Sequence, residues 1–306
     1  MKNRYKKNFR IIDATHVSSG GGQVILELLL KELDLSKHDI LLCSKNFREK
    51  GRVNMVTIES ELSRIFWYIA HLGLRNTHRV VNINSSICLG AIGFSNIVYF
   101  HNVLFFDRTA VKIYQKLVLS LSRQYEYLVQ TNYAQKILKN SIGIESKKFP
   151  FYREYSRRKT VDNLNKLRIF HISSDATHKQ NFMFEEVVDL LDRKGYQIYS
   201  TNEYGNNSVV VSISNIENGD LLELLEKGGV LLNTSKTESL CLPLVEAAQR
   251  GLTILTYDAP YVWEVVDNVY SFRTVDELRE MINKESLNKE ASLVLENNLN
   301  QLDSIL

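Results

Sequence analysis

Apolar and polar residues along this chain follow two alternating patterns, which are short apolar runs and longer stretches with helical periodicity. Short apolar runs predict buried strands. In the first half of the chain these runs are Phe9–Ala14, Ile40–Cys43, Val53–Ile58, Val80–Ile83, Ile97–Phe100 and Tyr127–Gln130. The helical patterns cover Val24–Leu33, Leu62–Leu72 and Val111–Ser122. Strands that alternate with helices indicate a mostly parallel sheet with helices on both faces.

A polar, strongly basic stretch at residues 151–166 interrupts this alternation, and we interpret it as a linker between two domains. Strand-like runs resume at Leu167–Ile172, near Ile198, and at Val209–Ser212, Val230–Asn233 and Thr253–Thr256, and helical patterns cover Phe182–Arg193, Asp220–Lys227 and Leu242–Arg250. The pattern therefore predicts two doubly wound α/β domains, at residues 1–150 and 167–274. Residues 275–306 are polar and helix-prone without strand signals, so we expect terminal helices that pack across the domains.

Composition narrows the class of protein. A chain of 306 residues with 44% hydrophobic residues can support a packed core in each of two domains. Its net charge is only +3, from 38 basic and 35 acidic residues, so nucleic-acid binding is not expected. The cysteines Cys43, Cys88 and Cys241 are widely spaced, which favours a reducing compartment over disulfides or structural zinc. Neither a signal peptide nor a membrane span of about eighteen apolar residues is evident, so we expect a cytoplasmic protein.

The segment Thr234–Pro260 carries the most informative set of polar residues. It runs from a predicted strand through a loop with Glu238 and Pro243 into a helix, and then into the next strand. Such a loop lies at the carboxyl end of a parallel sheet, where open α/β domains bind ligands. Glu238 and Glu246 lie near the start of the helix, where carboxylates can accept hydrogen bonds from sugar or ribose hydroxyls. The helix start itself can bind an anionic group.

This segment resembles the signature of glycosyltransferase family 4, a group of retaining enzymes with the GT-B fold. The residues in register with the family pattern are Ser235, Glu238, Leu242, Pro243, Glu246, Ala247 and Gly251. By this resemblance, Glu246 holds the ribose hydroxyls of the donor and Glu238 faces the transferred sugar. Ser239 and Leu240, which directly follow Glu238, belong to the same expected donor-binding set.

A second resemblance lies at Ile169–Phe182, where a predicted strand leads through a loop into a helix. In that position an ammonium group can neutralise a diphosphate beside the positive end of the helix. The family's phosphate loop has an Arg soon after the strand and a Lys before the helix. Lys179 matches the Lys, whereas Ser173 or Ser174 stands near the place of the Arg. Either His178 or a residue from elsewhere compensates for the Arg, or diphosphate binding is weaker.

The first domain carries two further candidate features. The glycine-rich loop Val17–Gln23 follows the first strand and opens a helix, which lets the backbone approach an anion closely. It resembles the glycine-rich loop of the family's acceptor domain, and Gly21 and Gly22 are its candidate donor contacts. His101 ends an apolar strand, at a place where the family often has a His that reaches the transferred sugar.

The resemblance implies the GT-B architecture, in which two doubly wound Rossmann-like domains face each other across a cleft. It implies transfer of a glycosyl group from a UDP- or GDP-sugar to an acceptor hydroxyl with retention of configuration, with Glu238, His101 and Lys179 as catalytic candidates. Neither a metal nor another cofactor is expected. The expected acceptor is a saccharide or lipid-linked saccharide of bacterial lipopolysaccharide, capsule or exopolysaccharide synthesis. The basic runs Lys2–Arg10 and Arg153–Lys159 would allow peripheral contact with an anionic membrane.

Two other interpretations stay open at the level of the sequence. The absence of the phosphate-loop Arg and the short chain fit a non-catalytic GT-B partner subunit that binds a nucleotide sugar or another protein. A nucleotide-sugar epimerase on a similar two-domain fold would convert the donor without any acceptor. Loss of transfer with intact donor binding distinguishes the first of these, and donor conversion alone distinguishes the second.

Overall fold

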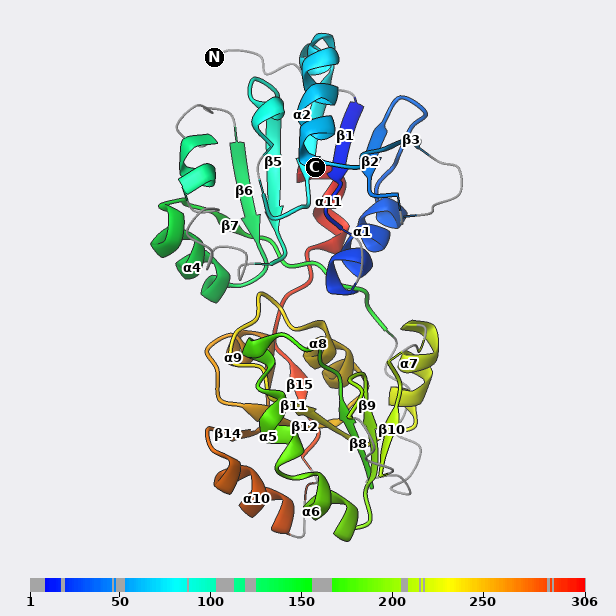
Figure 1. The fold of residues 1–306 in the computed structure, drawn as a ribbon, viewed down its shortest axis with the longest axis vertical. Coiled ribbons are helices and arrows are strands. Elements are labelled where there is room, and N and C mark those ends of the chain that lie inside the picture. The colour runs from blue at the N-terminus through cyan, green and yellow to red at the C-terminus, as the bar shows by residue number, and fades with distance from the viewer. Residues whose placement is uncertain are drawn as a thin grey trace. The chain divides into compact units, whose positions relative to one another are not determined.

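The structure of the chain is a computed structural model. It describes residues 9–17, 20–45, 47, 53–86, 88–102, 113–118, 125–155, 167–204, 209–214, 216, 218–284, 287 and 289–305. The chain divides into two compact units, of which unit 1 comprises Met1–Arg153 with Glu296–Leu306 and unit 2 comprises Glu154–Leu295 (Figure 1). The division between Arg153 and Glu154 falls inside the stretch 151–166 that the sequence marks as a linker.

Within the described residues, unit 1 contains a sheet of seven parallel strands in the order β3-β2-β1-β4-β5-β6-β7. These strands are β1 (Phe9–Ala14), β2 (Ile40–Cys43), β3 (Asn54–Thr57), β4 (His78–Asn82), β5 (Ser95–Phe100), β6 (Tyr125–Val129) and β7 (Lys147–Lys148). The sequence does not predict β7, because its two exposed lysines at the edge of the sheet leave no apolar run.

Alternate side chains of β1 enter two cores on opposite faces of this sheet. The helices of unit 1 are α1 (Gly20–Glu32), α2 (Glu61–Ala70), η1 (Leu72–Asn76), η2 (Leu89–Ala91), α4 (Asn132–Ile142), η5 (Leu299–Gln301) and α11 (Leu302–Ile305), and residues 113–118 are also helical. Ile12 packs in a core with α1 and with Leu302 of α11. Ile11 packs in another core with Tyr68 of α2 and Ala91 of η2. The sheet is thus covered on both faces, as a doubly wound domain requires.

In the part of unit 2 that is described, six parallel strands form a sheet in the order β10-β9-β8-β11-β12-β14. The strands of the unit are β8 (Arg168–His171), β9 (Gln197–Ser200), β10 (Val210–Ser212), β11 (Val230–Asn233), β12 (Thr253–Tyr257), β13 (Val266–Asp267), β14 (Tyr270–Phe272) and β15 (Ser292–Leu293). Its helices are η4 (Thr177–Lys179), α5 (Asn181–Glu185), α6 (Val188–Arg193), α7 (Asn218–Glu226), α8 (Leu242–Gln249), α9 (Val262–Val265) and α10 (Val275–Asn283). Both units are therefore α/β, with Rossmann-like parallel sheets.

The C-terminal stretch 275–306 differs in part from the helices that the sequence predicts. α10 forms as predicted, but β15 then pairs antiparallel with β13. So short a strand has no room for the apolar alternation that would reveal it. From Glu296 the chain belongs to unit 1, where Asp303 accepts a hydrogen bond from Arg10 Nη2 at 2.9 Å.

The single helix predicted at Phe182–Arg193 is two helices, α5 and α6, separated at Glu186 and Val187. At the break, the carbonyl oxygen of Glu186 accepts a hydrogen bond from Arg279 Nη2 at 3.2 Å, and the two side chains form an ion pair at 2.7 Å. Arg279 lies far away in the sequence, so the local apolar pattern cannot reveal this contact.

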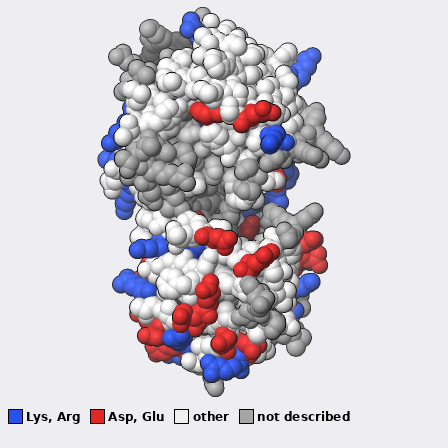
Figure 2. Space-filling view, in the orientation of Figure 1, with Lys and Arg blue, Asp and Glu red and all other residues white. Residues whose placement is uncertain are grey.

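Charged side chains of both signs mingle on unit 2 in the face that Figure 2 shows, whereas much of the described surface of unit 1 in that view is uncharged. Neither unit shows a continuous basic stripe on this face. No helix within the described residues is long and apolar enough to cross a membrane.

The interior of unit 1 contains an ion pair that joins β1 to α2. Asp13 Oδ2 accepts hydrogen bonds from Arg64 Nε at 2.9 Å and from Tyr68 OH at 2.7 Å. Asp13 Oδ1 accepts from Asn84 Nδ2 at 2.7 Å and from Thr15 Oγ1 at 3.1 Å. Neither side chain of the ion pair is exposed to solvent. Buried charges are tolerated only when paired and hydrogen-bonded in this way.

Replacing Asp13 with Asn removes the carboxylate that compensates the buried Arg64 guanidinium. We expect the free energy of unfolding to fall by about 3–5 kcal/mol, which is the usual cost of breaking a buried ion pair. Urea denaturation at neutral pH measures this change. As a matched control, Asp276→Asn removes a 92% exposed partner of Arg279. That control should cost less than about 1 kcal/mol.

The same variant has a second readout, the pH dependence of stability. Burial opposes ionisation of Asp13, but Arg64, Tyr68 and Asn84 outweigh it and lower the pKa of Asp13. Because the folded pKa is the lower one, this stabilisation is complete above the unfolded pKa of about 4 and is lost as pH falls through the folded pKa. Denaturation in acid should show that loss in the wild type and not in Asp13→Asn. Parallel pH curves for the two proteins would contradict the assignment.

Candidate functional site

The first and fourth strands of each sheet are neighbours, so the loops that follow them meet at one edge. In unit 2 these strands are β8 and β11, which pair in parallel. From them the strand order runs outward in opposite directions, to β9 and β10 on one side and to β12 and β14 on the other. Such a switch point forms the crevice in which open α/β sheets bind ligands. It brings together the two loops that the sequence selects in this unit.

Lys179 and Glu238 form an ion pair at this edge. Lys179 Nζ lies 2.5 Å from Glu238 Oε1, and the two side chains are 16% and 15% exposed. The loop backbones are joined as well, since Thr234 Oγ1 donates to the Lys179 carbonyl at 2.5 Å and Lys236 N donates to the His178 carbonyl at 2.8 Å. Burial alone would lower the pKa of Lys179, but Glu238 outweighs it and raises that pKa. Lys179 therefore keeps the positive charge that an anion-binding role needs.

His178 and Ser173 lie on the same loop in different surroundings. His178 Nε2 is 3.8 Å from Glu238 Oε1, so this imidazole lies beside the ion pair. Ser173 N donates to Thr201 Oγ1 at 2.8 Å, and Ser173 Oγ donates to Asn181 Oδ1 at 2.7 Å. The Ser173 hydroxyl is thus engaged in holding its own loop.

His171, which the sequence analysis does not select, is the last residue of β8, the strand that leads into this loop. It is buried and stacks on Phe184 with ring centroids 4.2 Å apart. Its Nε2 lies 3.2 Å from Thr234 Oγ1, and its Nδ1 lies 3.1 Å from Tyr204 OH. Burial, reinforced by the charge of Lys179, lowers the pKa of His171 to about 3. This neutral ring therefore supports the loop without competing with Lys179 as a cation.

The loop after β11 ends at Cys241, whose φ of +59° lies in the left-handed region that side chains disfavour. α8 begins at the next residue, and the side chain of Cys241 makes no capping hydrogen bond to it. Glu246 lies one turn inside α8 and is 8% exposed. Ser239 and Leu240, which the sequence analysis also selects, are buried, with exposures of 5% and 2%.

Tyr261, a second residue that the sequence analysis misses, holds this loop against the sheet. Its hydroxyl accepts a hydrogen bond from Asn233 Nδ2 at 2.9 Å and donates to the Ser235 carbonyl at 2.8 Å. Asn233 also donates to Thr256 Oγ1 at 2.9 Å. Tyr261 is fully buried. In the sequence it is simply an aromatic residue just after the segment Thr234–Pro260, and such a residue predicts a place in the core rather than a role in a loop.

In unit 1 the structure brings Gly22 and His101 together. A Cβ atom on Gly22 would lie 2.9 Å from His101 Nε2, so glycine leaves room for the imidazole. His101 Nδ1 lies 3.3 Å from Ser85 Oγ, and burial lowers the pKa of His101 to about 4. His101 is therefore a neutral hydrogen-bonding group. Gly21 is exposed in the first turn of α1, and residues 18–19 of the same loop lie outside the described residues.

The cysteines and the acidic residues form no further centre within the residues that the structure describes. Cys43, Cys88 and Cys241 are free and buried, and burial raises the pKa of both Cys88 and Cys241 to about 12. The thiols of Cys88 and Cys241 therefore stay protonated at neutral pH. No group of three or more His, Cys, Asp or Glu side chains among the described residues is arranged to hold a metal ion.

Comparison with known proteins gives matches in structure only, since no protein-family profile and no curated protein sequence matches the chain. HepE of Anabaena, solved in complex with UDP and glucose, has a TM-score of 0.66 and 13% identity over 90% of this chain and 88% of that chain. WaaG, a glycosyltransferase involved in lipopolysaccharide biosynthesis, has a TM-score of 0.68 and 14% identity over 97% of this chain and 95% of that chain. The sucrose-phosphate synthase of Thermosynechococcus elongatus has a TM-score of 0.70 and 10% identity over 90% and 89% of the two chains. The protein therefore has the GT-B fold, as the sequence predicts.

Tyr261→Phe removes the hydroxyl that links Asn233 to the loop after β11. It leaves buried polar groups without their partner, so we expect the free energy of unfolding to fall by about 1–3 kcal/mol. Urea denaturation measures the change. Tyr199→Phe is the matched control, because the Tyr199 hydroxyl makes an exposed hydrogen bond of 3.4 Å to Gln197. Equal effects of the two substitutions would contradict the role of Tyr261.

Proposed function

We propose that this protein is a glycosyltransferase that moves a sugar from a nucleoside diphosphate sugar to an acceptor hydroxyl. The observation that carries the proposal is the ion pair of Lys179 and Glu238, at the switch point of unit 2 in the loops before α5 and α8. A diphosphate is the anion that such a cation and the helix dipole of α8 suit. HepE was solved with UDP and with UDP-glucose, which supports a uridine nucleotide as the donor.

The groups at this edge have complementary roles in the proposed transfer. A diphosphate competes with Glu238 for the ammonium of Lys179, and Lys179 then offsets the charge that develops on the leaving group. The exchange frees the Glu238 carboxylate to accept hydrogen bonds from the transferred sugar. Glu246 accepts hydrogen bonds from the ribose hydroxyls. His178, which lies beside the ion pair, is the candidate that substitutes for the family's Arg.

In unit 1, His101 and Gly22 are the candidates for contact with a sugar, by the resemblance to family 4. A neutral imidazole can donate or accept a hydrogen bond with a sugar hydroxyl, and burial keeps His101 neutral. We assign retention of anomeric configuration, because the spacing of Glu238 and Glu246 resembles that of family 4. No metal or further cofactor enters this proposal.

The acceptor that we propose is a saccharide on a lipid carrier, of the kind used in lipopolysaccharide, capsule or exopolysaccharide synthesis, and the surface of α2 supports it. Leu62, Phe66 and Ile69 point outward, with exposures of 68%, 66% and 52%. The opposite face of the helix buries Arg64 and Tyr68. A helix with its apolar face outward suits the surface of a lipid bilayer.

Basic residues would add electrostatic attraction to anionic lipids. The basic runs are Lys2–Arg10 and Arg153–Lys159, of which only residues 9–10 and 153–155 lie among the described residues. Arg75 is exposed in η1, directly after α2. An apolar helix face with cationic residues near its end should bind an anionic membrane more strongly than a neutral membrane.

Donor binding is tested with Lys179→Met and Glu246→Gln against UDP, GDP, UDP-glucose and GDP-mannose. We expect one nucleotide to bind the wild type, and Lys179→Met to weaken it by about ten- to a hundredfold, because a charge-assisted hydrogen bond is lost. Glu246→Gln should weaken it by about tenfold for the same reason. Isothermal titration calorimetry measures both changes.

Lys236→Met is the control for donor binding, because Lys236 is exposed on the same loop and carries the same charge. An equal loss of affinity in Lys236→Met would show a general charge effect and refute the site. A wild type that binds none of the four nucleotides refutes the proposed function. Donor binding without transfer to any acceptor would instead favour a non-catalytic partner subunit.

Membrane contact is tested by sedimentation with vesicles of phosphatidylglycerol and phosphatidylcholine. Phe66→Glu puts a charge on the outward face of α2, so the fraction bound should fall by about tenfold, as one buried aromatic contributes at least 1.4 kcal/mol. Phe182→Glu, at a 55% exposed phenylalanine of α5, should bind as the wild type does. Equal binding by all three proteins would exclude α2 as the contact surface.

A further inference from the structure

A tryptophan of unit 2 is exposed beside the loops of the Lys179–Glu238 ion pair, and the proposed function does not use it. Trp263 lies in α9, which follows β12, the strand next to β11 in the sheet. Val262 and Val265 of this helix are fully buried, whereas Trp263 is 48% exposed. The indole therefore lies on the solvent side of a helix that the core holds in place.

One carboxylate fixes the orientation of this indole. Trp263 Nε1 donates to Asp258 Oδ1 at 2.8 Å. Arg273 Nε donates to Asp258 Oδ2 at 2.7 Å, and Arg273 Nη2 lies 2.6 Å from the same oxygen. The hydrogen bond from Trp263, together with Arg273, outweighs burial and lowers the pKa of Asp258. Hydrogen bonds to an ionised carboxylate are strong, so the indole and the guanidinium are held side by side.

The sheet keeps Asp258 and Arg273 together. Asp258 directly follows β12 and Arg273 directly follows β14, and these two strands pair in parallel. Asp258 N donates to the Phe272 carbonyl at 2.8 Å, and Arg273 N donates to Glu277 Oε2 at 2.6 Å. The indole and guanidinium are thus mounted on rigid elements, as a binding surface requires.

The segment that carries Trp263 is also bonded to the loop of Glu238. Tyr261 directly precedes α9, and its hydroxyl donates to the carbonyl of Ser235 in that loop at 2.8 Å. Neighbouring strands lie about 4.8 Å apart, so β12 and β14 lie about 5 and 10 Å from β11 along the edge. A saccharide that reaches a sugar held at Glu238 can therefore also contact Trp263.

The groups on Asp258 select a class of ligand. The indole offers a flat apolar face, and the guanidinium offers N–H donors in a fixed geometry. Arg273 is 72% exposed, and its Nη1 has no hydrogen-bond partner in the described part of the chain. A pyranose ring has C–H groups on its face and hydroxyls around its rim, so it complements both groups. A protein partner would instead need a continuous apolar surface, whereas a carboxylate and a guanidinium border this indole.

We propose that Trp263 and Arg273 form a binding surface for a sugar ring of the acceptor saccharide. Trp263 stacks on the C–H face of the ring, and Arg273 donates to its hydroxyls. Asp258 is a positioning residue that holds both. The inference rests on the proposed glycosyl transfer, because the acceptor must lie beside the sugar that is there assigned to Glu238. All of the residues of this surface belong to unit 2.

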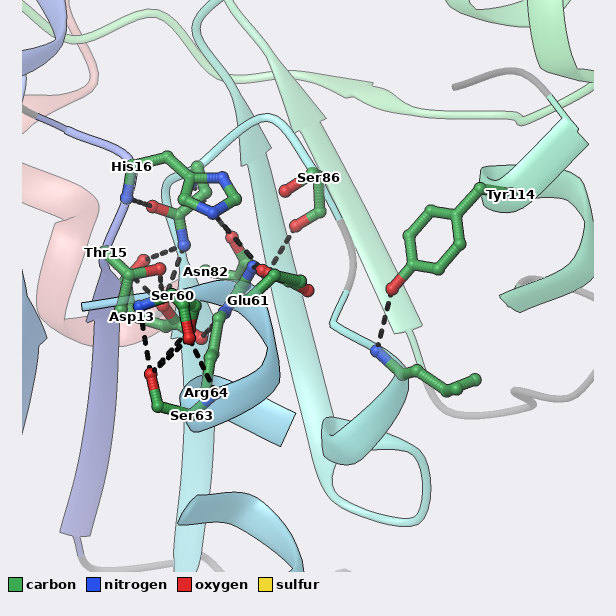
Figure 3. A network of polar contacts seen from close by, with 12 residues as sticks. Asp13, Thr15, His16, Ser60, Glu61, Ser63, Arg64, Asn82, Ser86 and Tyr114 are labelled. Atoms are coloured by element: carbon green, nitrogen blue, oxygen red, sulfur yellow. Dashed lines mark hydrogen bonds and ion pairs between the residues drawn. The ribbon is translucent and has the colours of Figure 1, made fainter. Parts of the chain in front are cut away.

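Trp67 and Trp263 are the two tryptophans of the chain, which makes this surface directly observable. Trp67 lies in unit 1 on α2, the helix that carries Glu61 and Arg64 in the polar network of Figure 3. It stacks on His71 with ring centroids 4.3 Å apart. Trp67→Phe keeps an aromatic ring at that place and leaves Trp263 as the only tryptophan. The indole fluorescence of this variant therefore reports on the proposed surface alone.

The full chain of Trp67→Phe is titrated with maltose, cellobiose, lactose and N,N′-diacetylchitobiose, without a nucleotide. At least one of them should change the emission of Trp263 along a saturable curve, because a ring that covers the indole removes water from it. Trp263→Phe, whose only tryptophan is Trp67, should show no such change. A Trp67→Phe protein that responds to none of the four overturns the proposal, and so does an equal response from Trp263→Phe.

Transfer from the donor that calorimetry identifies to the responding disaccharide gives a second readout. Trp263→Ala should raise the KM for the disaccharide about three- to tenfold, the usual effect of one aromatic stacking contact, and leave nucleotide affinity and melting temperature unchanged. Arg273→Ala should also raise this KM. Arg279→Ala is the matched control and should not, because Arg279 is a surface arginine of α10 paired with Glu186. A disaccharide that binds but is not glycosylated overturns the acceptor assignment.

The two proposals fail in different ways. Nucleotide binding without any saccharide response at Trp263 refutes this inference and leaves the proposed function standing. A saccharide response in a protein that binds no nucleotide refutes the proposed function, and it supports Trp263 as a saccharide-binding residue.

Discussion

The strand order of each sheet is the constraint on which the rest of the structure depends. In both units the first strand pairs with the fourth, and every pairing in the two large sheets is parallel. Parallel strands place all of their following loops at one edge, and open α/β sheets bind ligands where the strand order changes direction, as it does at this pair. Residues that are distant in the sequence meet there, Lys179 with Glu238 in unit 2 and His16 with Asn84 in unit 1. Each unit thus carries its candidate chemistry at the same topological position.

Open crevices of this kind require loops that hold their own shape, and buried polar contacts supply it. Asp13 does so in unit 1, and Tyr261 does so in unit 2, each by bonding to groups on more than one element. The backbone is also held in the left-handed region at Ser85, Gln180 and Cys241, with φ values of +56°, +49° and +59°. Such conformations cost free energy and persist where surrounding contacts impose them, which is common at functional sites. All three residues lie in the loops of the candidate sites.

Local pattern is sufficient to predict most strands and to place Lys179 and Glu238 in loops that follow strands, but it does not predict the contacts that support those loops. β1, β2 and β11 have the bounds that their apolar runs predict, because a strand buried on both faces leaves an unbroken run. Lys179 and Glu238 can be selected from the spacing of sequence motifs, because each lies in a loop that directly follows a strand. The roles of Arg64 and Tyr261 cannot be predicted in this way, since their hydrogen-bond partners lie far away in the sequence. A helical pattern of apolar residues also predicts that the apolar face is buried. In α2, however, Arg64 is buried, because it is the cationic partner of Asp13 among the hydrogen bonds of that carboxylate.

The switch points of the two sheets distribute charge differently. Lys179 and Glu238 together are neutral, so a diphosphate gains the ammonium only by displacing the carboxylate. In the proposed function, that exchange favours a ligand that offers an anion to Lys179 and sugar hydroxyls to Glu238, as a nucleotide sugar does. In unit 1 the buried ion pair behind Glu61 is neutral as a whole, so Glu61 leaves a net negative charge beside His16.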